Sequence, residues 1–370
     1  MTRSTATALL DLDDLEALHA GDPGDMLGNV ASAGAQVREA LRTCDDVGLW
    51  VVRDQGIPRA VVVAGMGGSG IAGHVLQAAA GPDCPIPVER VRGWTLPAWV
   101  GPDDLVIAVS SSGRTAETSA CVAEALQRGA RLVVVAAADS PLVDEARAAG
   151  VPWVPVPAGR PPRANLWALS VPLLVVGDAL GIVHASRSDL AGVADLLDDI
   201  AGRCGPAAAT AVNPAKQLAG ELLGSLPMLW GSSDLAGIAA YRMLCQLAEN
   251  AKTLAVNGVL PEALHNQVVA FDGPPAGAAV AVRLVMLRDT VEHPNVSISA
   301  DVVEQLARDH AVPVSLVVAT GRHPLHRIAS LVAVTDFASV YLGLLRGVDP
   351  TPIAPIEALK AALERSRNHP

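Results

Sequence analysis

The sequence contains few aromatic residues: Phe, Trp and Tyr together make up 3% of its 370 residues. Because 51% of the residues are nevertheless hydrophobic, a buried core has to be built mainly from Ala, Val and Leu. Such side chains suit helices packed on a parallel sheet, whose strands are buried on both faces. At this length the chain can form two domains, each with its own core.

Basic residues are also scarce, with 27 Lys and Arg against 38 Asp and Glu, which gives a formal net charge of −11. This balance argues against nucleic acid and anionic membranes as partners, but it does not exclude a small anionic ligand held by local donors. The five cysteines form no CxxC pair and are predicted to be free, buried thiols rather than disulfides or zinc ligands. No uninterrupted apolar run reaches the roughly 18 residues of a membrane span. The first residues lack the pattern of a secretion signal, so we expect a cytoplasmic protein.

Two buried strands in the first half are each followed by a loop of small residues and then by a helix. The apolar run 60–64 leads into Gly65-Met66-Gly67-Gly68-Ser69-Gly70, here called the glycine loop. The apolar run 105–109 leads into Ser110-Ser111-Ser112-Gly113-Arg114-Thr115, the serine loop. With a third apolar run at 131–136, this order of strand, loop, helix and strand predicts a doubly wound parallel sheet.

The second half of the chain repeats the pattern of an apolar strand that ends in a Gly/Ser turn. Met228-Leu229-Trp230 is followed by Gly231-Ser232-Ser233, and a helical pattern begins after this turn. A repeat of this length indicates two similar units that arose by duplication. The predicted organisation is an N-terminal helical segment (1–50), a first domain with both loops (51–185), a linker with a helix (186–215), a second domain (216–346) and a C-terminal segment (347–370).

The serine loop has the chemistry of an anion site. The hydroxyls of Ser110, Ser112 and Thr115 can surround an oxyanion, and Gly113 allows a sharp turn of the backbone. The helix that follows adds free N–H groups and the positive end of its dipole. A phosphate could thus be held with little formal positive charge. The same residues are equally compatible with an ordinary helix cap, because Ser and Thr favour both roles.

The glycine loop allows a different function. Gly65, Gly67 and Gly70 satisfy a GxGxxG pattern between a strand and a helix, and Glu89 follows Gly70 by 19 residues, close to where a ribose-binding acid would lie. A dinucleotide-dependent oxidoreductase is therefore an alternative. A dinucleotide fold does not require a second, hydroxyl-rich loop, however, so the pair of loops favours a phosphate site.

Several segments resemble one known family. Gly67-Gly68-Ser69-Gly70 together with the serine loop is similar to the two phosphate-side loops of sugar isomerase (SIS) domains. Leu247-Ala248-Glu249-Asn250-Ala251-Lys252, Leu260-Pro261-Glu262-Ala263-Leu264-His265-Asn266 and Gly347-Val348-Asp349-Pro350-Thr351-Pro352-Ile353 resemble the bifunctional phosphoglucose/phosphomannose isomerase family. The resemblance implies two SIS-type doubly wound α/β subdomains, each an α-β-α sandwich, with N-terminal helices and a C-terminal helix.

The resemblance also implies an activity, the interconversion of glucose 6-phosphate and/or mannose 6-phosphate with fructose 6-phosphate through a cis-enediolate, without metal or cofactor. Glu249 would move the proton between C2 and C1. His265 and Lys360 would serve ring opening, and Arg163, in Pro161-Pro162-Arg163-Ala164, would offset the charge that develops on the enediolate. Residues 349–352 precede Lys360, and Thr351 among them is a candidate for shaping the space near C2.

For the phosphate, the resemblance implies a set of residues from both loops. His265 would reach in from a second subunit, so a homodimer with a phosphorylated hexose as substrate is expected. The predicted phosphate-binding residues are Gly67, Gly68, Ser69, Ser110, Ser112 and Thr115.

Three positions depart from the family pattern. Ser111 stands in place of the usual Tyr, Arg114 in place of Asn, and Gln267 in place of Glu. None of these changes removes a predicted catalytic group, but the sequence assigns no role to Arg114 or Gln267. A non-catalytic sugar-phosphate binder with a regulatory role therefore remains the second hypothesis.

Overall fold

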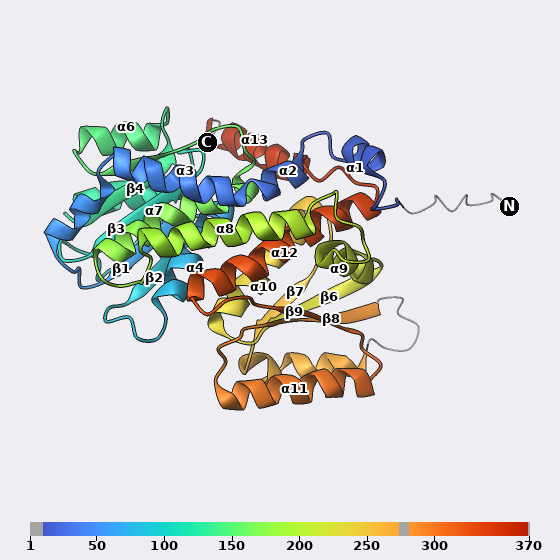
Figure 1. Ribbon diagram of the computed structural model, residues 1–370. Helices are drawn as coiled ribbons and strands as arrows, with labels where there is room; N and C mark the ends of the chain where they lie inside the picture. The colour runs from blue at the N-terminus through green and yellow to red at the C-terminus, as the bar shows by residue number, and fades with distance from the viewer. Residues whose placement is uncertain (1–9, 274–280, 369–370) are drawn as a thin grey trace.

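The computed structural model describes residues 10–273 and 281–368. Two parallel sheets lie on either side of a layer of helices, with the first sheet at the upper left of Figure 1 and the second at the lower right. The prediction of two doubly wound α/β subdomains is confirmed, with N-terminal helices before the first sheet and a C-terminal helix after the second.

The first sheet has five strands in the order β2-β1-β3-β4-β5, all paired in parallel. Its central strands are fully buried runs rich in valine, as expected for a sheet covered on both faces. The strands are β1 (Val61–Gly65), β2 (Val88–Val91), β3 (Leu105–Ser110), β4 (Arg131–Ala137) and β5 (Trp153–Val156). The helices of this half are α1 (Leu15–Gly21), α2 (Met26–Ala31), α3 (Ala33–Asp46), α4 (Gly67–Ala80), α5 (Ala116–Gln127), α6 (Pro141–Ala148) and α7 (Leu166–Ala179), with short 3₁₀ helices η1 (Leu49–Gln55) and η2 (Pro162–Ala164).

The second sheet has four parallel strands in the order β7-β6-β8-β9. This order matches that of the first sheet without its last strand, as duplication predicts. The strands are β6 (Ser225–Gly231), β7 (Val256–Val259), β8 (Ala281–Arg288) and β9 (Val314–Val318). The helices are α8 (Arg187–Cys204), α9 (Pro214–Leu222), α10 (Asp234–Asn250), α11 (Pro294–Asp309), α12 (Pro324–Leu345) and α13 (Ala354–Asn368), with η3 (Glu262–His265) and η4 (Gln267–Asp272).

The largest hydrophobic core is shared by the two halves. It joins the inner faces of both sheets to helices of the middle layer, among them α4, α7, α10 and α12. The outer face of the first sheet is covered by α5 and α6, and that of the second sheet by α11, which lies at the bottom of Figure 1. The two sheets are therefore held together by apolar packing.

Helix α12 is long and apolar enough to cross a membrane, with 22 residues and a mean hydropathy of 1.8. In the structure, 89% of its most apolar window is buried inside the protein, so it packs as a core helix. All five cysteines are free, as predicted: Cys44, Cys121 and Cys204 are buried, whereas Cys84 and Cys245 are half-buried.

Both sheets reverse their strand order at one place. In the first, the chain passes from β1 outward to β2 and then returns to β3 on the other side of β1; in the second, β6, β7 and β8 repeat this path. Ligands of open α/β sheets bind beyond the carboxyl ends of the strands at such a topological switch point. The first switch point lies beyond β1 and β3, and the second lies beyond β6 and β8.

Candidate active site

The glycine and serine loops meet at the first switch point, because β1 and β3 are neighbours in the sheet. The glycine loop continues into α4 and the serine loop into α5. Neither helix has a side-chain cap at its N-terminus. The Ser69 N–H donates to the Met66 carbonyl oxygen at 3.1 Å, but the other N–H groups of these first turns, together with the dipoles of two helices of 14 and 12 residues, are available to one anion.

Hydrogen bonds within and between the loops fix their shape. The Ser110 Oγ lies 2.9 Å from the Thr115 Oγ1 and accepts from the Gly113 N–H at 3.0 Å. The Ser111 N–H donates to the Ser69 Oγ at 3.0 Å, which ties one loop to the other. Gly113 has a φ of +60°, and a Cβ there would lie 2.0 Å from the Ser140 Oγ, so only glycine fits.

Of the predicted phosphate ligands, Ser69 and Ser110 are buried and Ser112 is exposed. Gly67 has a φ of +54° and opens the first turn of α4 with free space beside it. A Cβ on Gly68 would lie 3.2 Å from the carbonyl oxygen of Pro162. The glycine loop therefore passes close to η2, which carries Arg163.

Arg163 is the most heavily engaged of the predicted catalytic residues, with 3% of its surface exposed. Its Nε donates to the Asn250 Oδ1 at 2.7 Å, and its Nη2 donates to the carbonyl oxygens of Pro350 and Thr351, both at 2.8 Å. Its Nη1 lies 3.7 Å from the Glu249 Oε2. Burial lowers the pKa of Arg163, and the charge of Glu249 opposes this effect.

Asn250 and Lys252 support this arrangement in ways the sequence did not indicate. Asn250 is fully buried, and its Nδ2 donates to the Ser339 Oγ of α12 at 2.9 Å. Lys252 adopts a left-handed backbone with a φ of +51°, and its Nζ donates to the carbonyl oxygens of Glu249 and Pro350 at 2.6 and 3.3 Å. Burial and then the charge of Arg163 lower the pKa of Lys252. Two cations therefore hold the segment around residue 350 against the end of α10.

A buried ion pair fixes the backbone of Arg163. The guanidinium of Arg242 on α10 bonds Asp336 on α12, with 2.6 Å between Nη2 and Oδ2, and the same Nη2 donates to the Arg163 carbonyl oxygen at 2.8 Å. Because buried ion pairs are costly to break, η2, α10 and α12 are held in one arrangement. This network brings Arg163 and Glu249 together beside the glycine loop.

His265 and Lys360 do not join this cluster within one chain. His265 lies exposed at the end of η3, and Lys360 lies exposed on α13. In the described part of the chain, no hydrogen bond or ion pair links either of them to Glu249 or Arg163. Their predicted roles remain predictions. Thr351 contacts the site through its backbone carbonyl, whereas its buried Oγ1 points at Gly24 and has no hydrogen-bond partner among the described residues.

The two positions without a predicted role have structural explanations. Arg114 is exposed and its Nη2 donates to the carbonyl oxygen of Asp139 at 3.3 Å, so it braces the outside of the serine loop. Gln267 accepts from the Trp230 Nε1 at 2.7 Å and donates to the Asn257 carbonyl oxygen at 3.0 Å. Gln267 thereby satisfies the polar atom of a fully buried Trp in the second sheet.

The geometry is unfavourable for dinucleotide binding. Glu89 is the second residue of β2 and pairs with Val62 within the sheet, whereas the carboxyl end of β2 is Val91. A ribose-binding acid would be needed at that end, beside the glycine loop. In residues 10–273 and 281–368, no group of three or more His, Cys, Asp or Glu is placed to hold a metal ion.

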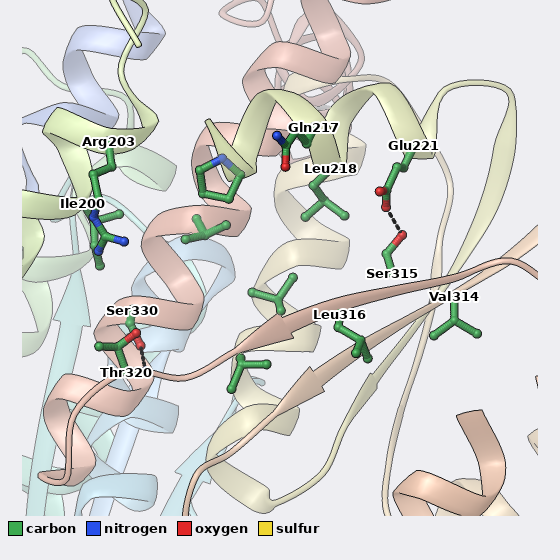
Figure 2. A pocket seen from close by; sticks show the side chains of 14 residues that line it. Ile200, Arg203, Gln217, Leu218, Glu221, Val314, Ser315, Leu316, Thr320 and Ser330 are labelled. Atoms are coloured by element: carbon green, nitrogen blue, oxygen red, sulfur yellow. Dashed lines mark hydrogen bonds between the residues drawn. The ribbon is translucent and has the colours of Figure 1, made fainter. Parts of the chain in front are cut away.

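A cavity of about 330 Å³ lies elsewhere in the molecule. Figure 2 shows it between α9 and β9, with Gln217 and Glu221 above and Leu316 below, and Glu221 bonded to Ser315. None of the predicted site residues lines it. The candidate active site is therefore the open surface at the first switch point.

This arrangement defines a class of proteins with two SIS-type halves, and comparisons with known proteins agree. Residues 94–151 match the SIS domain, and residues 211–363 match the bacterial phospho-glucose isomerase C-terminal SIS domain. A solved structure of a hypothetical protein from Thermus thermophilus has a TM-score of 0.74 at 19% identity, and the match covers 96% of this chain and 94% of that one.

Curated relatives narrow the class to a family. A bifunctional phosphoglucose/phosphomannose isomerase from Caldicellulosiruptor bescii is 33% identical over 303 residues, which cover 82% of this chain and 89% of the relative. Another from Aquifex aeolicus is 29% identical, with 83% and 91% covered. The chain belongs to the bifunctional phosphoglucose/phosphomannose isomerase family, as its sequence segments predicted.

Proposed function

We propose that this protein is an aldose–ketose isomerase that interconverts glucose 6-phosphate and/or mannose 6-phosphate with fructose 6-phosphate. The observation that carries the proposal is the Arg163–Glu249 pair, 3.7 Å apart and directly beside the glycine loop. A sugar whose phosphate lies at the two loops would extend its reactive end toward this pair. Membership of the family supports the same activity.

In this proposal the two side chains divide the chemistry. The Glu249 carboxylate takes the proton from C2 of the open-chain aldose and returns it to C1 through a cis-enediolate, while the hydroxyl proton passes from the C2 oxygen to the C1 oxygen. Arg163 and Lys252 supply positive charge near the oxygens on which negative charge develops. Neither step requires a redox partner, because the oxidation of one carbon balances the reduction of its neighbour.

Hydrogen exchange tests this function. With fructose 6-phosphate in deuterated water, we expect deuterium at C2 of the aldose 6-phosphate that forms, because the proton held by Glu249 exchanges with solvent. Mass spectrometry of the product measures the label. If no aldose and no label appear while fructose 6-phosphate still raises the melting temperature, the protein is a non-catalytic sugar-phosphate binder and the proposal fails.

We further propose that the enzyme works as a homodimer in the cytoplasm, with His265 entering the active site of the partner. Two features support a dimer. His265 is exposed and has no hydrogen bond or ion pair with Glu249 among the described residues, and α13 exposes Ile356, Leu359 and Leu363 on the helix that carries Lys360. Apolar side chains gathered on one helix typically pack against another surface.

Mixing two inactive variants tests this subunit arrangement. Glu249→Gln and His265→Ala are each expected to be inactive alone. If one site uses Glu249 of one chain and His265 of the other, each mixed dimer contains one intact site. Unfolding and refolding the variants together at equal amounts should then restore roughly a quarter of wild-type activity, since about half of the dimers are mixed. No recovery from a mixture that contains heterodimers would show that one chain supplies both groups.

A further inference from the structure

The second switch point, beyond β6 and β8, has the same construction as the first. In the first sheet Gly65 of β1 pairs with Val109 of β3, and in the second Gly231 of β6 pairs with Leu287 of β8. Ser111 lies two residues after Val109, and Asp289 lies two residues after Leu287. Ser111 and Asp289 therefore occupy equivalent positions in the two halves.

The hydrogen bonds repeat as well. The Ser111 N–H donates to the Ser69 Oγ at 3.0 Å, and the Asp289 N–H donates to the Ser232 Oγ at 2.8 Å. In both halves a serine that follows the first strand accepts this N–H, but the serines differ in position: Ser69 is the fourth residue after Gly65 and lies in α4, whereas Ser232 directly follows Gly231. The second half therefore ties its two strand ends together by a similar hydrogen bond, although the loop that follows β6 differs from the glycine loop.

What differs is the side chain at the centre of the second switch point. The Asp289 carboxylate is 2% exposed. Its Oδ2 accepts from the Ser233 Oγ at 2.8 Å, and its Oδ1 accepts from the Arg327 Nη1 at 2.6 Å. The Ser233 Oγ also accepts from the Ala236 N–H in the first turn of α10. An anionic group of the chain therefore lies at the N-terminus of a 17-residue helix.

Arg327 provides more donors than Asp289 uses. Only 8% of the residue is exposed, and its buried Nε has no hydrogen-bond partner among the described residues. A second carboxylate nearby, that of Glu292, is already paired with Arg288 at 2.8 Å. The positive charge of Arg327 is thus directed at the position of the Asp289 carboxylate.

We propose that the second switch point is an anion site closed by the protein's own carboxylate, Asp289, and that removing this carboxylate opens it to inorganic phosphate or a phosphate monoester. The wild-type chain then binds one phosphosugar, at the first switch point. This inference rests on the geometry of the second half and not on the proposed isomerase activity.

Counting bound phosphate tests the proposal. In equilibrium dialysis with radiolabelled inorganic phosphate, we expect one phosphate per chain for the wild type and two for Asp289→Ala. Asp289→Asn, which keeps the volume of the side chain, and the double variant Asp289→Ala/Arg327→Met should each bind one. Phosphate should also raise the melting temperature of Asp289→Ala more than that of the wild type, because it pairs the buried Arg327.

Asp289→Ser carries the same test if Asp289→Ala does not fold, because serine is the residue at the equivalent position of the first half. One phosphate per chain in a folded Asp289→Ala or Asp289→Ser variant that retains Arg327, with no additional stabilisation by phosphate, would overturn the proposal. Two phosphates per wild-type chain would overturn it equally, because the second site would then already be open.

Discussion

Replacing Glu249 by Gln is expected to lower kcat about 10³-fold and to leave KM within a few-fold, as is typical for loss of a general base. Gln keeps the length and helix propensity of Glu, so α10 and the contacts of Asn250 should persist. What is lost is the carboxylate that, in the proposed mechanism, moves the proton between C2 and C1. Coupled-assay kinetics measures kcat and KM, and the deuterium label at C2 should disappear with the activity.

Glu89→Gln is the matched control for this variant. Glu89 is an exposed carboxylate on the edge strand β2, and it is the residue on which the dinucleotide alternative rested in the sequence. Its replacement should leave the isomerase rate unchanged. A Glu249→Gln enzyme that retains a tenth or more of wild-type kcat would exclude Glu249 as the base.

Arg163→Met should have the second-largest effect, a fall in kcat/KM of about 10² to 10³-fold, comparable to loss of a donor to a developing oxyanion. It should also destabilise the fold by a few kcal/mol, because the amide oxygen of Asn250 and the carbonyl oxygens of Pro350 and Thr351 lose their donor. Kinetics well below the melting temperature, together with urea unfolding, separates these two effects.

Two further variants make the Arg163 result interpretable. Arg160→Met removes a nearby arginine that pairs with Glu39 at 3.5 Å, and it should change kcat/KM less than two-fold. Arg163→Lys keeps a positive charge but loses the planar fork that reaches Asn250 and residue 350 together, so it should recover only part of the rate. Full activity of a stable Arg163→Met enzyme would remove Arg163 from the mechanism.

The central strands were predictable because their burial requires apolar residues. Residues 60–64, 105–109 and 131–136 read as continuous apolar runs, and they form β1, β3 and β4. The sequence did not predict β2 or β7, since each has four residues and includes polar or glycine positions. Both are edge strands whose side chains are mostly half-buried or exposed. They therefore show neither a continuous apolar run nor an alternation of apolar and polar residues.

The division of the chain into five segments remains a prediction. Most of the segment 186–215, for which a linker with a helix was predicted, is occupied by α8. For the site, local pattern indicated only an anion loop, and the family resemblance added Glu249 and Arg163. Glu249 and Arg163 are far apart in the sequence, and they come together because Arg163 bonds Asn250, the neighbour of Glu249. A local sequence pattern could not indicate this contact. The exposure of His265 and Lys360 could not be predicted from the sequence either, because it depends on which other segments pack against them.

Helix α10 begins at the serine that binds Asp289 and ends at Glu249 and Asn250. With 17 residues it is a rod about 25 Å long whose two ends serve the two switch points. In the proposed mechanism the duplicated halves have different tasks: the first binds the phosphate of the substrate, and the second supplies the carboxylate of Glu249. Neither half expressed alone would contain both the two loops and Glu249, so we expect neither to show isomerase activity.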